Sequence, residues 1–321
     1  MSIRERLEAQ EQAVLADRAQ PAASSKGRDR LEEEDSLRTC FQRDRDRIVH
    51  SKAFRRLAHK TQVFLAPEGD HYRVRLTHTL EVTHIARAIA RARALNEDLT
   101  EAICLGHDLG HTPFGHLGEE VVAAFHPGFK HNLQSVRIVE VLEDLNLTWE
   151  VRDGIANHTW TMPPPATLEG QIARFADRIA YINHDIDDSL RAGLLAPEDL
   201  PPAAKALGAS PGDRIETMVG DLVEASHDAD EIQMSDSIFE SMSEMRSFLF
   251  ERVYMGVVAP ATRHSVELIV SSLLEHFSAE PGEAGRIEAV DYVAGMTDRF
   301  ALRAFEQVVG RPPPGLEAQL G

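Results

Sequence analysis

The chain has 321 residues and a formal net charge of −18, and 43% of its residues are hydrophobic while only 6% are aromatic. This length suits two domains or one large helical domain, with a core built mainly from Leu, Ile, Val and Ala. The negative charge disfavours a general nucleic-acid binder, since phosphate backbones need Lys and Arg to neutralise them, and it disfavours an anionic membrane surface.

The N-terminal residues, the lack of long apolar runs and the small number of cysteines exclude further classes of protein. The first 20 residues carry charges throughout and contain no apolar core of a signal peptide. No apolar run approaches the roughly 20 residues that a membrane span needs. Cys40 and Cys104 are too few for a disulfide framework or a Cys-rich zinc site, so we expect free thiols in a soluble, cytoplasmic protein.

In chain order, the first predicted element is a polar helix over 4–18, followed by a linker with the sequence PAASSKG at 21–27. From Asp35 onward, apolar residues recur at helical spacing. This periodicity predicts helices over 80–96, 99–109, 131–145, 149–158, 168–190, 215–225, 238–253, 263–277 and 287–309. Strand signals are scarce, although residues 72–76 could form one arm of a hairpin. The sequence therefore predicts an all-α fold.

Histidines are concentrated in one part of the chain. Ten of the 15 lie between His50 and His131, and imidazole is both the commonest metal ligand and the usual acid–base group near neutral pH. The densest stretch is AICLGHDLGHTPFGHLGEE (102–120), which contains His107, Asp108 and His111. Its glycines at 106, 110, 115 and 118 would let the backbone approach a ligand closely.

A metal site needs more donors than this stretch alone supplies. His78 opens the predicted 80–96 helix, and Asp177 lies in an apolar stretch where an ionised carboxylate is costly unless it is paired or metal-bound. Together with His107 and Asp108 they give two imidazoles and two carboxylates, a donor set suited to Mn, Fe, Co, Ni or Zn and less well to Mg. The His-Asp pair alone is weak evidence for a metal site, because it occurs three times in the chain.

The order His78, His107-Asp108, Asp177 matches the H…HD…D pattern of the HD-domain metal-dependent phosphohydrolases. Longer segments resemble the bacterial deoxyguanosinetriphosphate triphosphohydrolase-like family, over residues 35–310. They are SKAFRRLAHKTQVF (51–64), RLTHTLEV (75–82), HDLGHTPFGHLGE (107–119), KHN (130–132), ADRIAYINHDIDD (176–188) and MRSFLFERVY (245–254).

This resemblance implies an HD-domain helical bundle with additional C-terminal helices. We expect an N-terminal extension and linker (1–34), an HD-domain catalytic core (35–195), a C-terminal helical region packed on the core (196–311) and a tail (312–321). It also implies a homo-oligomer, for which the long helix predicted over 287–309 could supply an interface, and a second, allosteric dNTP.

The activity implied by the resemblance is metal-dependent hydrolysis of deoxynucleoside triphosphates to deoxynucleoside and inorganic triphosphate. Water activated by one divalent ion per active site, with Mn or Mg favoured for activity over Co, Ni, Fe or Zn, would attack the α-phosphorus. A histidine would act as general acid for the departing 5′-oxygen.

The resemblance also assigns residues. The implied metal ligands are His78, His107, Asp108 and Asp177, and the implied catalytic residues are His111 and His131, with Glu119 orienting one of them. Arg75, His116, Arg178 and Tyr181 would face the triphosphate, while Gln62 and Asp185 would read the sugar 3′-hydroxyl. Without the resemblance, Arg75 and Arg178 would suit surface ion pairs, and Tyr181 ordinary helix packing.

Two other functions stay open: another HD phosphohydrolase, such as a 5′-nucleotidase, and a regulatory nucleotide- or single-strand-DNA-binding protein. The chain has no GxxxxGK[ST] or GxGxxG motif, so a P-loop or dinucleotide fold is excluded. Residues 43–75 hold nine Lys and Arg against four Asp and Glu, which gives a cationic approach to His78 that could admit a small triphosphate. Within this segment Arg55, Arg56 and Lys60 could serve the active site, a subunit interface or a regulatory nucleotide.

Overall fold

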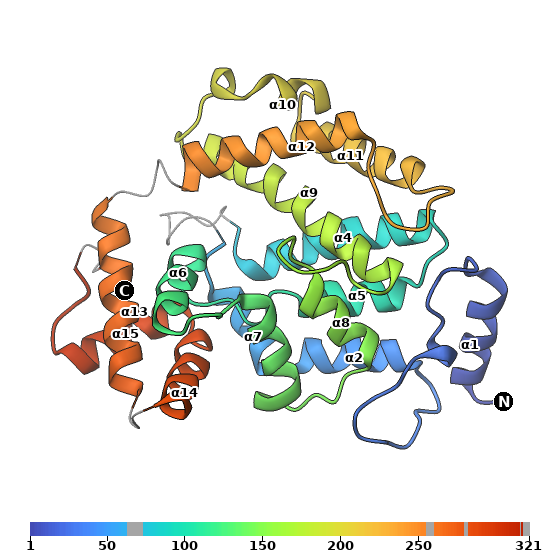
Figure 1. Ribbon diagram of the computed structural model, residues 1–321, viewed down its shortest axis with the longest axis horizontal. Coiled ribbons are helices and arrows are strands. Elements are labelled where there is room, and N and C mark those ends of the chain that lie inside the picture. The colour runs from blue at the N-terminus through green and yellow to red at the C-terminus, as the bar shows by residue number, and fades with distance from the viewer. Residues whose placement is uncertain (63–72, 255–259, 279–281, 315, 317–321) are drawn as a thin grey trace.

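The computed structural model describes residues 1–62, 73–254, 260–278, 282–314 and 316, and within these ranges the chain forms α-helices and no sheet, which confirms the all-α prediction. Helix α1 and helices α13–α15 lie at opposite ends of the longest axis (Figure 1). The helices are α1 (Ile3–Val14), α2 (Cys40–His50), α3 (Lys52–Arg56), α4 (Arg75–Ala92), α5 (Glu97–Gly106), α6 (Gly115–Phe125), α7 (His131–Arg137), α8 (Trp149–Asn157), α9 (Leu168–Arg191), α10 (Pro202–Leu207), α11 (Pro211–Ala225), α12 (Asp236–Leu249), α13 (Pro260–Phe277), α14 (Glu283–Ala294) and α15 (Asp298–Val309).

Most predicted helices occur close to their expected positions, and side-chain caps set their ends. Asn96 caps α5 by accepting the N–H of Leu99 at 3.2 Å, and Thr167 caps α9 by accepting that of Gly170 at 3.1 Å. Helices α2, α3, α6 and α10 are not among the predicted ranges. After α7 and α12 the chain continues as five-residue π-helical turns, over Ile138–Leu142 and Phe250–Tyr254.

Two sequence predictions are wrong in the region that the structure describes. The single helix predicted over 287–309 is two helices, because Gly295 ends α14 and Thr297 caps α15 by accepting the N–H of Phe300 at 3.3 Å. The hairpin arm predicted over 72–76 lies partly outside the described residues. Within them, Val74 makes one antiparallel bridge to Thr61, and α4 begins at the next residue.

The buried hydrophobic residues form two clusters. The first joins α2, α4, α5, α8, α9 and α10–α12 through residues such as Ile48, Ile103 and Ile179. The second joins α6 to α13–α15 through residues such as Val122, Leu273 and Phe305. The domain boundaries given above stay predictions. No helix in the described ranges has the length and apolar character that a bilayer crossing requires.

Glycines allow helices of the first cluster to cross closely. A Cβ on Gly154 of α8 would lie 2.5 Å from Cδ1 of the fully buried Ile103 on α5. The glycines expected to approach a ligand approach the protein itself. A Cβ on Gly110 would lie 2.2 Å from the backbone nitrogen of Ser135, and one on Gly118 would lie 1.9 Å from the carbonyl oxygen of Pro113.

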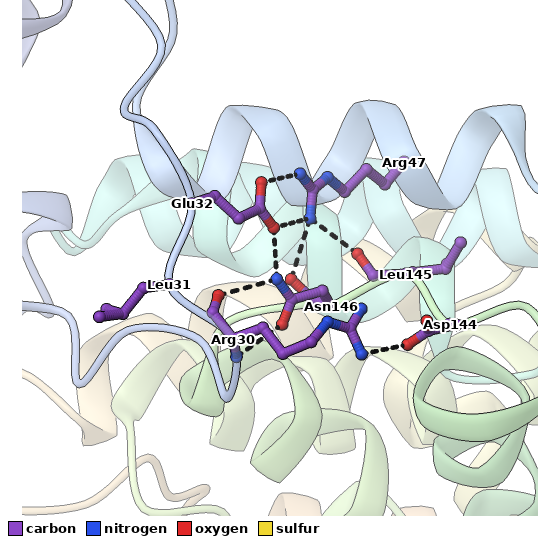
Figure 2. A pocket seen from close by; sticks show the side chains of 7 residues that line it. All are labelled: Arg30, Leu31, Glu32, Arg47, Asp144, Leu145 and Asn146. Carbon is purple, nitrogen blue, oxygen red and sulfur yellow. Dashed lines mark hydrogen bonds and ion pairs between the residues drawn. The ribbon is translucent and has the colours of Figure 1, made fainter.

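The first 34 residues are fastened to the first cluster by polar contacts. The buried Arg28–Asp44 ion pair is completed by Thr148, whose N–H and hydroxyl donate to Asp44 at 2.8 and 2.6 Å. Nearby, Arg30 pairs with Asp144 at 2.7 Å, while Arg47 and Asn146 both bind Glu32 (Figure 2). Each charged side chain drawn in this hollow has a partner there. The hollow therefore holds the first 34 residues in place and offers no unpaired charge to a ligand.

The second cluster is fastened to the first by a buried lysine and two further contacts. Lys60 Nζ donates to the carbonyl oxygen of Ala294 at 2.8 Å and to that of His111. Arg56 donates to the carbonyl oxygen of Gly295 at 3.0 Å, and Arg137 pairs with Asp291 at 2.7 Å. Burial, with repulsion from Arg56 and Arg75, lowers the pKa of Lys60 to about 7. Arg56 and Lys60 therefore have a role inside the fold.

We expect Gly154→Ala to destabilise the protein by about 1–3 kcal/mol, because the added methyl group overlaps Ile103 in a closely packed core. Gly220→Ala on the exposed face of α11 meets nothing within 4 Å and should stabilise by about 0.5–1 kcal/mol. Urea denaturation of both variants measures the two effects, and equal shifts would contradict the close crossing of α5 and α8.

We expect Lys60→Met to change how stability depends on pH. With a pKa of about 7 in the folded protein against 10.5 in the unfolded chain, Lys60 binds fewer protons when folded, so stability rises as the pH rises between these values. The rise in urea midpoint between about pH 7 and about pH 9.5 should therefore be smaller in Lys60→Met. Lys52→Met, at an exposed position on α3, is the control and should keep the wild-type rise.

Candidate active site

A cavity of about 550 Å³ opens between the two hydrophobic clusters and is lined by residues of α4, α6, α7, α9 and α12. It gathers nearly every site residue predicted from the sequence. The predicted residues that line it are Gln62, Arg75, His78, Asp108, His111, His116, Glu119, His131, Asp177, Arg178, Tyr181 and Asp185. The remaining one, His107, is buried beside His78 and Asp108.

The four predicted metal ligands come from three helices that pack on one another. His78 is in the first turn of α4, His107 and Asp108 follow the last residue of α5, and Asp177 is in the middle of α9. Asp177 Oδ1 lies 3.1 Å from Nε2 of His78 and 3.8 Å from Nε2 of His107, which lies 3.4 Å from Asp108 Oδ1.

The hydrogen bonds of His107 leave one of its ring nitrogens free for a ligand. Its Nδ1 donates to the carbonyl oxygen of Cys104 at 2.6 Å, so Nε2 carries the lone pair, and this buried atom has no hydrogen-bond partner among the described residues. One ligand atom from each of His78, His107 and Asp108 lies within 4.8 Å of the others. This mixed nitrogen and oxygen set fits a divalent transition metal.

A second group of polar side chains adjoins these donors. His131 Nδ1 contacts Glu119 Oε1 at 2.9 Å, and its ring stacks on that of His111 with centroids 4.1 Å apart. Burial and the neighbouring Arg75 hold the pKa of His111 well below its usual range. Burial also opposes protonation of His131, but the Glu119 carboxylate outweighs it and raises the pKa of His131. His131 is thus the more proton-rich member of the stacked pair.

The cationic side chains of the cavity differ in their pairing. Arg75 forms a buried ion pair with Asp108, with NH1 2.7 Å from Oδ2, while its Nε and NH2 have no partner among the described residues. Arg178 stacks on Trp160 with its guanidinium carbon 3.7 Å from the ring centroid. No carboxylate pairs with Arg178 in the described part of the chain, and burial lowers its pKa. Arg178 therefore presents an uncompensated positive charge.

Gln62 and the neighbours of Asp185 complete the cavity wall. The Tyr254 hydroxyl donates to Asp185 Oδ2, while Oδ1 of Asp185 and Oε1 of Gln62 are buried without a hydrogen-bond partner among the described residues. Burial raises the pKa of Asp185 to about 6. These two free acceptor atoms suit donors of a bound molecule, such as a sugar hydroxyl.

The structure adds residues that sequence reasoning did not single out. His158 follows α8, donates through Nδ1 to the carbonyl oxygen of Ile155 at 2.8 Å, and places Nε2 3.3 Å from Nε2 of His131. Nδ1 of His131 is hydrogen-bonded to Glu119, as Nδ1 of His158 is to Ile155. In the neutral rings both Nε2 atoms therefore carry lone pairs, so a proton or a cation must lie between them. The only sequence signal for His158 is its position at the end of an apolar helix, which it shares with His107. Arg246 and Tyr254 also line the cavity, from the recognised 245–254 segment.

Comparison with known proteins places this geometry in a family. The model of the HD domain matches residues 75–182, and that of the phosphohydrolase-associated domain matches 232–307. A deoxyguanosinetriphosphate triphosphohydrolase-like protein from Caldanaerobacter subterraneus subsp. tengcongensis is 53% identical over 338 residues, with 100% of this chain and 99% of the relative covered. One from Desulfatibacillum aliphaticivorans is 46% identical, with 96% and 98% covered.

Among solved structures, a hypothetical protein from Aquifex aeolicus aligns with a TM-score of 0.54 and 21% identity, covering 84% of this chain and 70% of that one. This likeness concerns the fold alone. HD domains bind divalent metals, and the His and Asp cluster of the cavity could hold one. With its full-length relatives at 46–53% identity, the chain belongs to the deoxyguanosinetriphosphate triphosphohydrolase-like family of HD-domain phosphohydrolases.

Proposed function

We propose that the protein hydrolyses deoxynucleoside triphosphates to deoxynucleoside and inorganic triphosphate, in a reaction that depends on a divalent metal ion. The observation that carries this proposal is the cavity itself, in which a His and Asp donor cluster lies beside arginines that have free guanidinium nitrogens. A phosphate chain lying along those arginines brings its α-phosphoryl group to the donor cluster.

His78, His107, Asp108 and Asp177 would hold the ion. When bound, a divalent ion supplies Lewis acidity, which lowers the pKa of water and polarises a phosphoryl oxygen. The protein holds the donors ready, since the Cys104 carbonyl fixes the tautomer of His107 and Arg75 fixes one oxygen of Asp108.

His111 and His131 supply the proton that the departing 5′-oxygen needs. His111 faces the donor cluster, with Nε2 3.6 Å from Asp108 Oδ1, and His131 stacks behind it against Glu119. Glu119 holds the tautomer of His131 and favours its protonated form, so that the stacked pair carries a proton next to the leaving group. Acid–base groups of this kind contribute ~10²–10⁴-fold to the rate.

The triphosphate is bound by cations that the fold leaves available. Arg178 and Arg246 face the cavity without a carboxylate partner among the described residues, and His116 and Tyr181 line the same cavity. The free Oδ1 of Asp185 accepts the hydrogen of the sugar 3′-hydroxyl, and the side-chain amide of Gln62 donates to the oxygen of the same hydroxyl. A homo-oligomer, an activating dNTP, a cytoplasmic location and a preference for Mn or Mg stay predictions.

Product identity tests the proposal directly. Incubation with Mn²⁺ and each dNTP in turn should release inorganic triphosphate and the deoxynucleoside, both resolved by ion-exchange chromatography. Release of orthophosphate or pyrophosphate from the dNTPs instead would contradict the proposal, and release of orthophosphate from deoxynucleoside monophosphates in a parallel incubation would favour a 5′-nucleotidase. Nucleotide binding without any product, with every metal tried, would favour a regulatory binding protein.

We expect Asp177→Ala to abolish stoichiometric metal binding without unfolding the chain, because the residue supplies a carboxylate to the donor cluster but packs no large apolar surface. Metal content by inductively coupled plasma mass spectrometry, with circular dichroism as the folding control, measures this. Asp187→Ala on the same helix removes a carboxylate that pairs with Arg73 and Arg191, and it should retain the metal. Full metal content in Asp177→Ala would refute the ligand assignment.

A further inference from the structure

We infer that Asp298, the first residue of α15, positions the loop that carries His111 and His116 and is therefore a positioning residue for the reaction. This inference rests on the proposed function, since it concerns the groups that act in that site. It assigns a role in the active site to α15, which lies in the region matched by the phosphohydrolase-associated domain model and contributes none of the predicted metal ligands or cavity-lining residues.

The Asp298 carboxylate binds two segments that lie far apart in the sequence. Its Oδ1 accepts the backbone N–H of Phe114 at 2.9 Å. Its Oδ2 accepts the backbone N–H of Thr61 at 2.9 Å and also the Thr61 hydroxyl. These three hydrogen bonds to one buried carboxylate hold both segments against the start of α15.

The loop needs such support because its backbone is in an unfavourable conformation. Phe114 has a φ of 64°, in the left-handed region that disfavours residues other than glycine, and Gly115 follows with a φ of 59°. These two residues form the turn between His111 and His116 and begin α6, which carries Glu119. A non-glycine residue in this region persists only where its surroundings hold it, and the Asp298 bond to the Phe114 N–H is one such restraint.

The second segment bound by Asp298 also leads into the cavity lining, since Thr61 precedes Gln62, whose carbonyl oxygen would lie 3.3 Å from a Cβ on Gly115. Lys60 adds a further contact, because its Nζ bridges the carbonyl oxygens of His111 and Ala294 at the end of α14. The junction of α14 and α15 is thus bonded to the loop at two points, to His111 through Lys60 and to Phe114 through Asp298. The predicted metal ligands lie on or beside α4, α5 and α9, so releasing the junction should spare metal binding.

Asp291 provides a matched control. It also fastens the second cluster to the first, by accepting from Gln134 at 2.9 Å and pairing with Arg137 at 2.7 Å, but it does not contact the loop. Loss of either carboxylate loosens the attachment of α14 and α15, whereas only loss of Asp298 releases the Phe114 turn.

The test compares Asp298→Ala, Asp298→Asn and Asp291→Ala in the full chain with Mn²⁺ and the best dNTP substrate. Misplacement of catalytic groups by about 1 Å can cost ~10²-fold, so kcat of Asp298→Ala should fall by ~10- to 100-fold, more than KM rises, with metal content unchanged. Asp298→Asn keeps one acceptor oxygen and should recover part of this loss. Asp291→Ala should keep kcat within about 2-fold of wild type.

Hydrogen–deuterium exchange gives a readout that does not depend on activity. Peptides covering 109–118 should exchange faster in Asp298→Ala than in wild type, and at the wild-type rate in Asp291→Ala. Equal exchange and equal kcat in the two alanine variants would overturn the inference. If the wild-type protein hydrolyses no dNTP, the proposed function fails while the exchange comparison still tests the positioning. If Asp298→Ala does not fold, Asp298→Asn and Thr61→Val take its place.

Discussion

The mutual packing of α4, α5 and α9 is the constraint on which the site depends. Each of these helices contributes to the donor cluster, so the apolar contacts of Ile103 and Ile179 also set the distances between His78, Asp108 and Asp177. Buried carboxylates and imidazoles are costly unless they neutralise or hydrogen-bond one another, and here they do both. A close-packed core tolerates little displacement, which gives the ligands a rigid frame from ordinary hydrophobic burial.

The site belongs to both hydrophobic clusters. Phe114 and Phe129 line the cavity and pack in the second cluster with the helices α13–α15, while the donor cluster lies among helices of the first. The regions that match two separate domain models therefore enclose one cavity. At their boundary, backbone carbonyl and N–H groups form hydrogen bonds with buried charged side chains. Because hydrogen bonds are directional, these contacts fix the relative orientation of the two regions as well as their distance.

The sequence predicts the donor cluster because few residue types bind metal ions, and because the order His78, His107, Asp108, Asp177 is a specific pattern. It could not predict His158 or Arg246, because their places in the cavity arise from tertiary crossings of α8 and α12 that no local pattern records. Apolar periodicity ran through 287–309 and hid the break at Gly295 and Thr297, where a helix end and a cap outweigh hydrophobic spacing. The glycines near His107 stand out in the sequence, but their close contacts with α7 and Pro113 depend on the fold and cannot be read from local spacing.

The stacking of Arg178 on Trp160 gives the cavity an optical reporter. The chain has two tryptophans, and the other, Trp149, lies on α8 under the ammonium group of Lys26. Trp160 lines the cavity, and the guanidinium groups of Arg174 and Arg178 both lie over its indole ring, Arg178 being the one that also lines the cavity. The intrinsic fluorescence of a protein in which Trp149 is replaced by Phe therefore reports on the occupancy of this pocket, in real time and without a labelled nucleotide.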